Sequence, residues 1–395
     1  MATSVLDYGA VGDGSTDDTA AIQATVAAVV SAGGGVVFVP AGVYMVSAPV
    51  VVASDCVWFL GEQAPVTMSS GGWQDGVLSV IRAAPSWSQG AAAQPAMLLW
   101  DAVTGGTPLN RGGVERLSID GGNTTTLIHG IATYGRIAAF GADNVIVGGF
   151  YHADSIGINN IQGTTSGNLT PVGNTYSNIL VQQCYGGGCY LGSGDLQVFS
   201  VHAQSCTTPG QNTGDGITIY GGAGDARVIG CRGDLSTNGF VIDATLGAAN
   251  SYLGMVQLVG CSTQRNRQNG LKISNDEGQA ICPVLASGCS FQGDGVSGGY
   301  NAGVRCSGQV VATLSNCQVL VDTVDVAGGA PGYAITTASD GTAPPKAVSV
   351  MGGFYNAVTA FSHQANAPGI AVVNCLAWIG GQWTISGTPT HQTAM

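Results

Sequence analysis

The chain has 395 residues, 63 of which are glycine, and charged residues make up only 9% of it. Hydrophobic residues make up 45%, which is enough to build a core and excludes the charge-rich composition of disordered proteins. The net charge is −12 with only 11 lysines and arginines, so nucleic acid is not expected as a partner.

The N-terminal sequence gives no targeting signal. It lacks a basic segment and has an aspartate at position 7, so no signal peptide is visible. Residues 19–54 carry no formal charge, but the three consecutive glycines at 33–35, two prolines and a change from helical to strand periodicity exclude a membrane-spanning helix there. We therefore expect no membrane partner. A virion component, a cytoplasmic protein and a part of a secreted protein remain as alternatives.

Residues 16–35 predict a short N-terminal helix. Thr16 or Asp17 can cap it, and Asp17 and Asp18 place negative charge at the positive end of the helix dipole. An apolar face follows at helical spacing, formed by Ile22, Val26, Val29 and Val30. Residues 33–35 are all glycine and end the helix. We interpret Asp13, Asp17 and Asp18 as turn and capping residues rather than as catalytic carboxylates.

Short strands follow the helix. Residues 36–46 and 50–60 are apolar segments around turns, which is typical of the first coils of a β-solenoid. Residues 62–110 contain many glycines and prolines and predict an irregular loop insertion or a widened coil. Trp73, Trp87 and Trp100 in this stretch could stack on sugars or anchor the loop by hydrophobic contacts.

From residue 114 the sequence repeats a turn, a glycine and a short apolar strand. Successive repeat glycines lie 27, 31, 28, 23, 31 and 33 residues apart, and they are Gly130, Gly157, Gly188, Gly216, Gly239, Gly270 and Gly303. Periods of this length with several short strands each predict a β-solenoid whose neighbouring coils pair in parallel. Because a solenoid exposes its core at its end, we interpret the N-terminal helix as the cap.

Cysteines mark the same repeat. Six of them lie 22, 25, 30, 28 and 28 residues apart, namely Cys184, Cys206, Cys231, Cys261, Cys289 and Cys317, and Cys375 follows 58 residues later. We predict a ladder of buried, reduced thiols, one per coil, because free cysteine packs as a small apolar residue. Such a column does not converge on one point, so we expect no metal.

Residues 7–22, with the sequence DYGAVGDGSTDDTAAI, resemble the N-terminal signature of the pectate-lyase-like superfamily, which includes pectate lyases, polygalacturonases and phage tailspikes. The resemblance implies an all-β fold, a single-stranded right-handed parallel β-helix (a β-solenoid) with a short N-terminal capping α-helix. It places the motif and the cap in residues 1–35 and the β-helix in residues 36–395, with the loop insertion around residues 62–110.

The resemblance also implies a function. It suggests a polysaccharide-cleaving enzyme, a glycosidase or a lyase of tailspike type, that acts in a groove on the outer face of the solenoid. The expected partner is a polysaccharide or cell-surface glycan, and no cofactor is expected. The alternatives are a phage tail or receptor-binding protein that binds glycan without cleaving it, and a purely structural solenoid. Similarity to tailspikes further implies a homotrimer and a location in the virion or outside the cell.

The strand after each repeat glycine supplies the candidate groove, because the equivalent strand lines the groove in pectate lyases and polygalacturonases. Inward-facing positions alternate with outward-facing ones, and the inward set is Ile217, Phe240, Leu271 and Val304. Asp243, Lys272 and Arg305 then face outward on adjacent coils, and together with Asp215 they are our candidate catalytic residues. A basic residue there could remove a proton α to a uronate carboxylate. A surface ion pair without a function is the alternative.

Further candidates lie near these residues in the repeat. Tyr190, Thr218 and Tyr220 share the outward columns and are candidate substrate-binding residues. His152 and Asp154 form another acid/base cluster at a coil corner, where plain turn residues are the alternative.

Asp215 lies in residues 212–216 (NTGDG), which look like the Asn-Thr-Asp-Gly motif of polygalacturonases with one extra glycine. The later polygalacturonase motifs are absent from the sequence, so a polygalacturonase mechanism is not supported. The alternative for Asp215 is a role in a turn.

Overall fold

The computed structural model describes residues 2–62, 78–104, 106–161, 172–221, 224–244, 253–275, 282–295, 302–320, 333–338, 346–356, 359–363, 370–373 and 376–378. They belong to two compact units, unit 1 (Met1–Tyr190) and unit 2 (Leu191–Met395). Both units are coils of short parallel strands, which confirms the predicted parallel β-helix. Trp73 and Cys375, which the sequence analysis singled out, lie outside the described residues.

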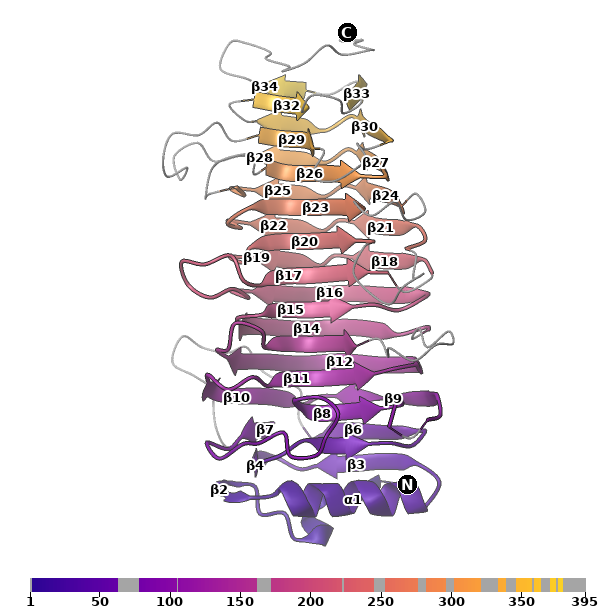
Figure 1. Cartoon of the computed structure of the whole chain (residues 1–395), viewed down its shortest axis with the longest axis vertical. Helices are drawn as coiled ribbons and strands as arrows, with labels where there is room; N and C mark the ends of the chain where they lie inside the picture. Colours follow the sequence, from indigo (N-terminus) through magenta and orange to yellow (C-terminus); the bar gives the residue numbers. More distant parts are fainter. Residues whose placement is uncertain are drawn as a thin grey trace. The chain divides into compact units, whose positions relative to one another are not determined.

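The N-terminal helix, α1 (Thr19–Ser31), lies beside the first coil of unit 1 (Figure 1). It buries Ile22, Val26 and Val29 as predicted, whereas Val30 is only half buried. Asp18 occupies the N-cap position, but its carboxylate accepts hydrogen bonds from the backbone N–H groups of residue 11 (2.7 Å) and residue 12 (3.1 Å). The predicted N-cap, Thr16 or Asp17, is therefore wrong, because the helix begins one or two residues later and its N-cap is Asp18. The Asp18 carboxylate binds the preceding loop and makes no capping hydrogen bond to the helix.

The remaining elements of unit 1 form three walls of parallel strands. One wall pairs β5, β8, β11, β13 and β15 in that order. The other walls pair β1, β3, β6, β9, β12 and β14, and β2, β4, β7, β10 and β12. The elements are η1 (Val5–Tyr8), β1 (Ala2–Ser4), β2 (Asp13–Asp17), β3 (Gly35–Val39), β4 (Gly42–Val46), β5 (Val50–Val52), β6 (Val57–Gly61), β7 (Ser79–Ala83), β8 (Ala96–Asp101), β9 (Leu109–Glu115), β10 (Ser118–Thr124), β11 (His129–Tyr134), β12 (Ile137–Phe150), β13 (Ile156–Ile161), β14 (Thr175–Cys184) and β15 (Gly187–Leu191).

Residues 78–110 contain regular coil strands where the sequence analysis expected an irregular stretch. β7 and β8 lie there and pair in parallel with strands of neighbouring coils. Trp100 in β8 is 1% exposed, and its ring packs edge to face against Phe59 and Phe140, with ring centroids 5.8 and 5.0 Å away. Trp87 is also buried, at 8% exposure. Of the two roles considered for these tryptophans, the described ones have the anchoring role.

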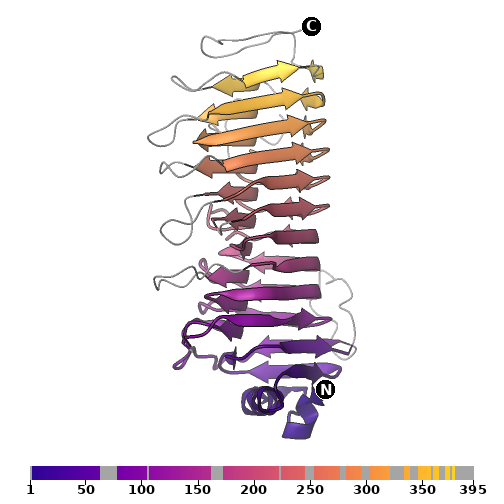
Figure 2. The same cartoon turned by 90° about the vertical axis from the view of Figure 1, so that its right-hand side faces the viewer.

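Unit 2 repeats the same three-walled plan (Figure 2). One wall pairs β17, β20, β23, β26, β29 and β32. The second pairs β16, β18, β21, β24, β27, β30 and β33, and the third pairs β16, β19, β22, β25, β28, β31 and β34. The strands are β16 (Leu196–Gln204), β17 (Asp215–Tyr220), β18 (Ala226–Ile229), β19 (Arg232–Asp234), β20 (Asn238–Asp243), β21 (Val256–Val259), β22 (Ser262–Gln264), β23 (Asn269–Asn275), β24 (Cys282–Ser287), β25 (Ser290–Gln292), β26 (Ala302–Gly308), β27 (Val310–Ser315), β28 (Gln318–Leu320), β29 (Tyr333–Ala338), β30 (Ala347–Met351), β31 (Phe354–Asn356), β32 (Thr359–His363), β33 (Ile370–Val373) and β34 (Leu376–Trp378).

The cysteines lie in the core. All ten described cysteines are free, and the six predicted ladder members are at most 1% exposed, which confirms buried, reduced thiols. A single column holds only four of the six; each of these donates a hydrogen bond of 3.3 to 3.6 Å to a carbonyl of the preceding coil, and they are Cys231, Cys261, Cys289 and Cys317. Cys206 instead aligns with Ser236, 30 residues later, whose hydroxyl accepts its N–H. The one-column ladder was therefore too simple, because the interval from Cys206 to the next cysteine is shorter than a coil.

Candidate functional site

The residues predicted to line a groove lie on the wall of unit 2 formed by β17, β20, β23, β26 and β29 (Figure 1). The inward residues are fully buried in the predicted register, namely Ile217, Phe240, Leu271 and Val304. Two outward rows run across the strands. The first row is Thr218, Val241, Lys272, Arg305 and Thr336, and the second is Tyr220, Asp243, Ser274 and Ser307.

Lys272 and Arg305 are direct partners in the first outward row. They lie on neighbouring parallel strands, which are about 4.8 Å apart, and both side chains are partly exposed. Two like charges at directly opposed positions of a sheet repel each other and destabilise it. An anionic group next to such a pair of cations, from the protein or from a ligand, would reduce this repulsion. Asp243, two positions along from the register partner of Lys272, supplies one such group.

Asp215 stands at the start of β17 and forms the first rung of a side-chain ladder. Its Oδ1 accepts hydrogen bonds from the backbone N–H (3.2 Å) and the Nδ2 (2.7 Å) of Asn238. Asn238 in turn accepts from Asn269, and Asn269 accepts from the N–H of Ala302. The structure therefore gives Asp215 the turn role that the sequence analysis weighed as the alternative, and the asparagines share it.

The Asp215 carboxyl is also electrostatically coupled to the groove. Burial raises its pKa, while the hydrogen bonds from Asn238 and the charge of Lys272 oppose the rise, and the charge of Asp243 adds to it. The charges of Lys272 and Asp243 therefore both act on the Asp215 carboxyl. A carboxyl with a raised pKa is a candidate for proton exchange with a substrate.

Hydroxyl groups share the outward rows with the charged residues. The hydroxyls of four residues in the outward rows are buried without a hydrogen-bond partner in the described part of the chain, namely Thr218, Ser274, Ser307 and Thr336. A buried hydroxyl without a partner costs about 1 to 3 kcal/mol. Ser274, Ser307 and Thr336 were not among the predicted site residues. Extending the outward register to the end of the repeat would have found Thr336, but burial could not be deduced from the spacing.

Thr218 and Tyr220 differ from the expectation of open, sugar-contacting side chains. Thr218 is 0% exposed and Tyr220 is 8% exposed. The Tyr220 ring packs over Gly192, where a Cβ would meet ring carbons at 2.4 Å. The absence of a side chain at that glycine explains the burial of the ring. Burial also raises the pKa of the Tyr220 hydroxyl, so this group stays protonated.

The remaining predicted site residues lie in unit 1. Tyr190 lies in β15, is the register partner of Asn159 in β13, and is partly exposed. His152 and Asp154 lie between β12 and β13, with the His152 Nδ1 3.8 Å from an Asp154 Oδ2 that belongs to a 79% exposed side chain. The His152 ring nitrogen accepts the backbone N–H of Asp154 (3.1 Å), which is the geometry of a turn. The structure brings these two residues together.

No helix among the described residues is long and apolar enough to cross a membrane. No group of three or more histidine, cysteine, aspartate or glutamate side chains in the same residues is arranged to hold a metal ion.

A mannuronan C5-epimerase of Azotobacter vinelandii, AlgE5, is 40% identical over 92 residues, which are 21% of this chain and 9% of that protein. Alginate lyase 7 of the same organism is 38% identical over 92 residues, 21% of this chain and 11% of that protein. These matches thus span about a tenth of the length of those relatives.

Solved structures resemble the whole chain in fold. The A-module of the Azotobacter vinelandii mannuronan C-5 epimerase AlgE4 superposes with a TM-score of 0.69 at 18% identity and covers 99% of both chains. The Dettilon tailspike protein superposes with a TM-score of 0.66 at 14% identity and covers 94% of this chain and 68% of its own. The family model for rhamnogalacturonase A/epimerase, pectate lyase-like, matches residues 2–219, more than half of the sequence. The chain therefore belongs to the rhamnogalacturonase A/epimerase family of pectate-lyase-like proteins.

Proposed function

We propose that the chain is a carbohydrate-active β-helix enzyme that acts on a uronate polysaccharide by removing the proton at C5. The observation that carries this proposal is the pair Lys272 and Arg305, which are register partners on the outer face of unit 2. Asp243 lies two positions along from the register partner of Lys272, and the charge of Lys272 acts on the pKa of Asp215. A glycan made of neutral sugars offers such cations no charge to bind, whereas a uronate offers one carboxylate per sugar.

The chemistry follows from where charge develops. C5 of a uronate is α to the carboxylate, and loss of its proton puts a second negative charge on that group. Arg305 is placed to neutralise the carboxylate, and preorganised charge of this kind is usually the largest contribution to catalysis. Lys272 or Asp215 accepts the proton, and Asp243 keeps Lys272 oriented.

Both lyase and epimerase chemistry begin with this step. A lyase then expels the glycosidic oxygen at C4, whereas an epimerase returns a proton to the opposite face of C5. The curated relatives include proteins named for each of these activities. Of the two classes predicted from the sequence, glycosidase and lyase, the cation pair favours the lyase, and the relatives add the epimerase.

The direct test is product analysis. The chain is incubated in D2O with mannuronan and, separately, with polygalacturonate. Deuterium at C5 with inverted sugars indicates an epimerase, unsaturated ends absorbing in the ultraviolet indicate a lyase, and reducing ends alone indicate a glycosidase. Binding without any product would favour the glycan-binding tail protein instead. If the protein neither binds these polymers nor forms a product, the proposal is refuted.

A pair of variants ties the activity to the groove. Lys272→Gln and Arg305→Gln should each lower kcat at least tenfold, which is about 1.4 kcal/mol, with little change in melting temperature because both side chains are partly exposed. Lys346→Gln removes an exposed cation elsewhere in unit 2 and is the matched control. Equal losses in all three variants would mean that net charge, not the groove, matters.

We further propose that the protein forms a homotrimer in the virion or outside the cell. The outer face of the wall containing β18, β21, β24 and β30 carries exposed apolar side chains: Ile229, Val259, Leu285 and Met351. Exposed apolar patches mark contact surfaces. The fold similarity to the Dettilon tailspike suggests identical subunits as the partner.

A further inference from the structure

A histidine, an arginine and an aspartate form a cluster on the outer face of another wall of unit 2, the one that contains β16, β19, β22 and β25. His202 on β16 and Arg232 on β19 are register partners, and Asp234 lies two positions after Arg232. The inward positions between them are Ala203 and Gly233, which are buried. The side chains of His202 and Arg232 are 32% and 47% exposed, whereas that of Asp234 is only 4% exposed. The cluster therefore reaches solvent through its two nitrogen-bearing side chains.

The Asp234 carboxylate joins these two side chains. Its Oδ2 lies 3.1 Å from the His202 Nε2 and also accepts the Nε–H of Arg232. The Nη2 of Arg232 donates to the Oε1 of Gln264 on the next strand (2.8 Å). A carboxylate oxygen only accepts hydrogen bonds, so the His202 Nε2 carries a hydrogen. In the neutral ring the unprotonated nitrogen is then Nδ1, for which the described residues provide no hydrogen-bond partner.

The burial of Asp234 distinguishes this cluster from an ordinary surface ion pair. Exposed pairs contribute only about 0 to 1 kcal/mol, because both partners stay hydrated. The Oδ1 of Asp234 is buried without a hydrogen-bond partner in the described part of the chain, so the carboxylate has lost hydration that its contacts do not fully replace. Such a group calls for an explanation other than stability. Orienting a histidine for proton transfer is a role that a buried carboxylate performs well.

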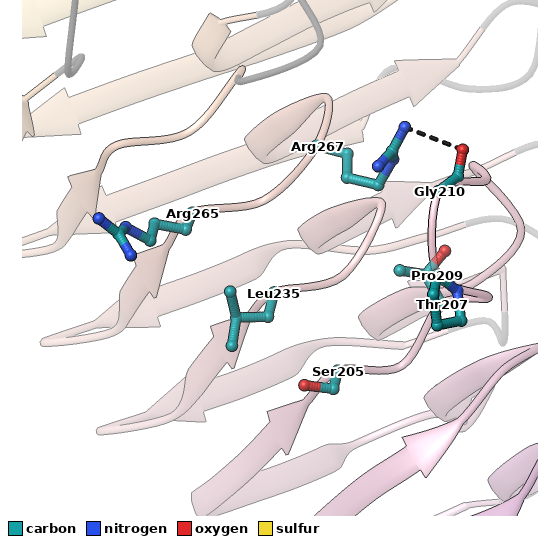
Figure 3. Close-up of a pocket in the computed structure, with 7 residues that line it drawn as sticks. All are labelled: Ser205, Thr207, Pro209, Gly210, Leu235, Arg265 and Arg267. Carbon is teal, nitrogen blue, oxygen red and sulfur yellow. Dashed lines mark hydrogen bonds between the residues drawn. The ribbon is translucent and has the colours of Figure 1, made fainter. Parts of the chain in front are cut away.

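A hollow of about 460 Å³ adjoins the cluster, at the corner where these strands end (Figure 3). Ser205, Leu235 and Arg265 line it, and they directly follow the last residues of β16, β19 and β22. Leu235 is three residues after Arg232, which is no more than about 10 Å along an extended strand. The hollow can therefore hold one part of a polymer whose neighbouring units lie over His202 and Arg232.

We propose that His202, Arg232 and Asp234 form a hydrolytic site that removes O-acyl esters, such as acetate, from a polysaccharide. His202 is the general base, and Arg232 stabilises negative charge on the carbonyl oxygen. Asp234 is a positioning residue, because it orients the His202 ring and stabilises its positive charge. Hydrolysis of a glycosidic bond would instead require a pair of carboxyl groups, and the cluster holds one. This activity is separate from proton removal at C5 and does not depend on it.

The reaction is a single displacement by water. The His202 Nδ1 takes a proton from a water molecule while the water oxygen bonds to the carbonyl carbon of the ester. The carbonyl oxygen becomes negatively charged and pairs with the exposed side of the Arg232 guanidinium. When the bond between the carbonyl carbon and the sugar oxygen breaks, the imidazolium returns its proton to the sugar oxygen. The products are a free sugar hydroxyl and a carboxylic acid, which releases its proton to solvent.

The test measures release of acetate from O-acetylated mannuronan and from O-acetylated glucomannan, and the wild type should release it from at least one of them. His202→Gln keeps a hydrogen-bond donor for Asp234 but removes the base, and it should lower the rate by about a hundredfold or more. Arg232→Gln should lower the rate by about tenfold or more. Arg227→Gln removes an exposed cation on β18 and is the matched control, which should keep the wild-type rate.

Asp234→Asn separates a positioning role from a purely structural one. It should lower kcat with little change in KM, and the nitrogen NMR signals of the His202 ring should lose their preference for a hydrogen on Nε2. If His202→Gln lowers the melting temperature, His202→Ala with added imidazole replaces it, and failure of imidazole to restore acetate release would contradict the base role. The inference is overturned if the wild type releases acetate from neither polymer, if His202→Gln keeps the wild-type rate, or if Arg227→Gln loses as much activity as Arg232→Gln.

Discussion

At the level of single residues, burial decides chemistry that spacing cannot reveal. The sequence predicts which groove residues lie in register, because the repeat glycines fix the alternation, and it placed Lys272 beside Arg305 correctly. It does not predict that Thr218 is enclosed or that the Tyr220 ring fills the space over Gly192, because these follow from contacts between coils.

A residue-scale prediction concerns His129 in unit 1. Its ring is 7% exposed, its Nδ1 accepts the N–H of Ile156 (3.1 Å), and burial lowers its pKa from 6.5 to about 4. The unfolded chain therefore binds a proton more readily than the folded one between these values. The free energy of unfolding should fall as pH drops from about 6.5 to about 4, by about 3 kcal/mol in total.

The measurement is urea unfolding of the wild type and of His129→Asn, which keeps an acceptor near Nδ1, from pH 7.5 to pH 4 (roughly the range over which histidine titrates). The difference between the two should shrink as pH falls. The comparison with the variant is necessary because Asp294, whose pKa burial raises to about 7, contributes the opposite trend, stabilising the fold as pH falls. A pH-independent difference would mean that His129 does not titrate as described.

Asp215 allows the turn role and the proposed catalytic role to be separated. Asp215→Asn retains the Oδ1 that accepts both hydrogen bonds from Asn238, and asparagine already fills the next two rungs of the ladder. The melting temperature should therefore stay within about 2 °C of the wild type, corresponding to roughly 0.5 kcal/mol or less. Turnover of mannuronan should fall at least tenfold if the carboxyl exchanges a proton with substrate. Unchanged turnover would leave Lys272 as the proton acceptor.

At the level of elements, the periodicity of the sequence predicted the repeat correctly but not where every strand begins and ends. The strands of residues 36–46 and the parallel pairing of coils follow from the repeat, and both are present. Residues 62–110 were expected to form an irregular loop insertion or a widened coil, because glycines and prolines obscure the short strands β7 and β8. The cysteines show the same limit. Six cysteines at nearly constant spacing predicted one column, but they occupy different corners of the coil because coil lengths vary.

The thiols give an element-scale prediction. Hydrogen bonding to Cys231 and burial raise the pKa of Cys261 to about 12, so its reactive thiolate is scarce at neutral pH. A thiol reagent at neutral pH should therefore label few cysteines in the native protein, with the half-buried Cys56 reacting first. In denaturant nearly all of the 11 cysteines should react. Several disulfides among the six ladder cysteines would contradict this account.

At the level of the whole molecule, the proposed trimer depends on the exposed apolar face of unit 2. Ile229 and Val259 are register partners that are 40% and 42% exposed, and Leu285 and Met351 are 40% and 45% exposed on the same wall. A monomer would leave these side chains in water, whereas association would bury them and gain about 25 cal/mol per Å² of apolar surface. A charge introduced at the centre of this face should oppose association, because it would be buried without a partner.

Val259→Glu makes that change, and Leu6→Glu is the matched control, since Leu6 is 47% exposed in unit 1. Sedimentation at micromolar concentration should give a trimer for the wild type and for the control, and a monomer for Val259→Glu. The melting temperature of the monomeric variant should fall with dilution less steeply than that of the wild type, because oligomer stability depends on concentration. A wild-type monomer at this concentration would remove the trimer proposal, and the groove in unit 2 would then have to act within one chain.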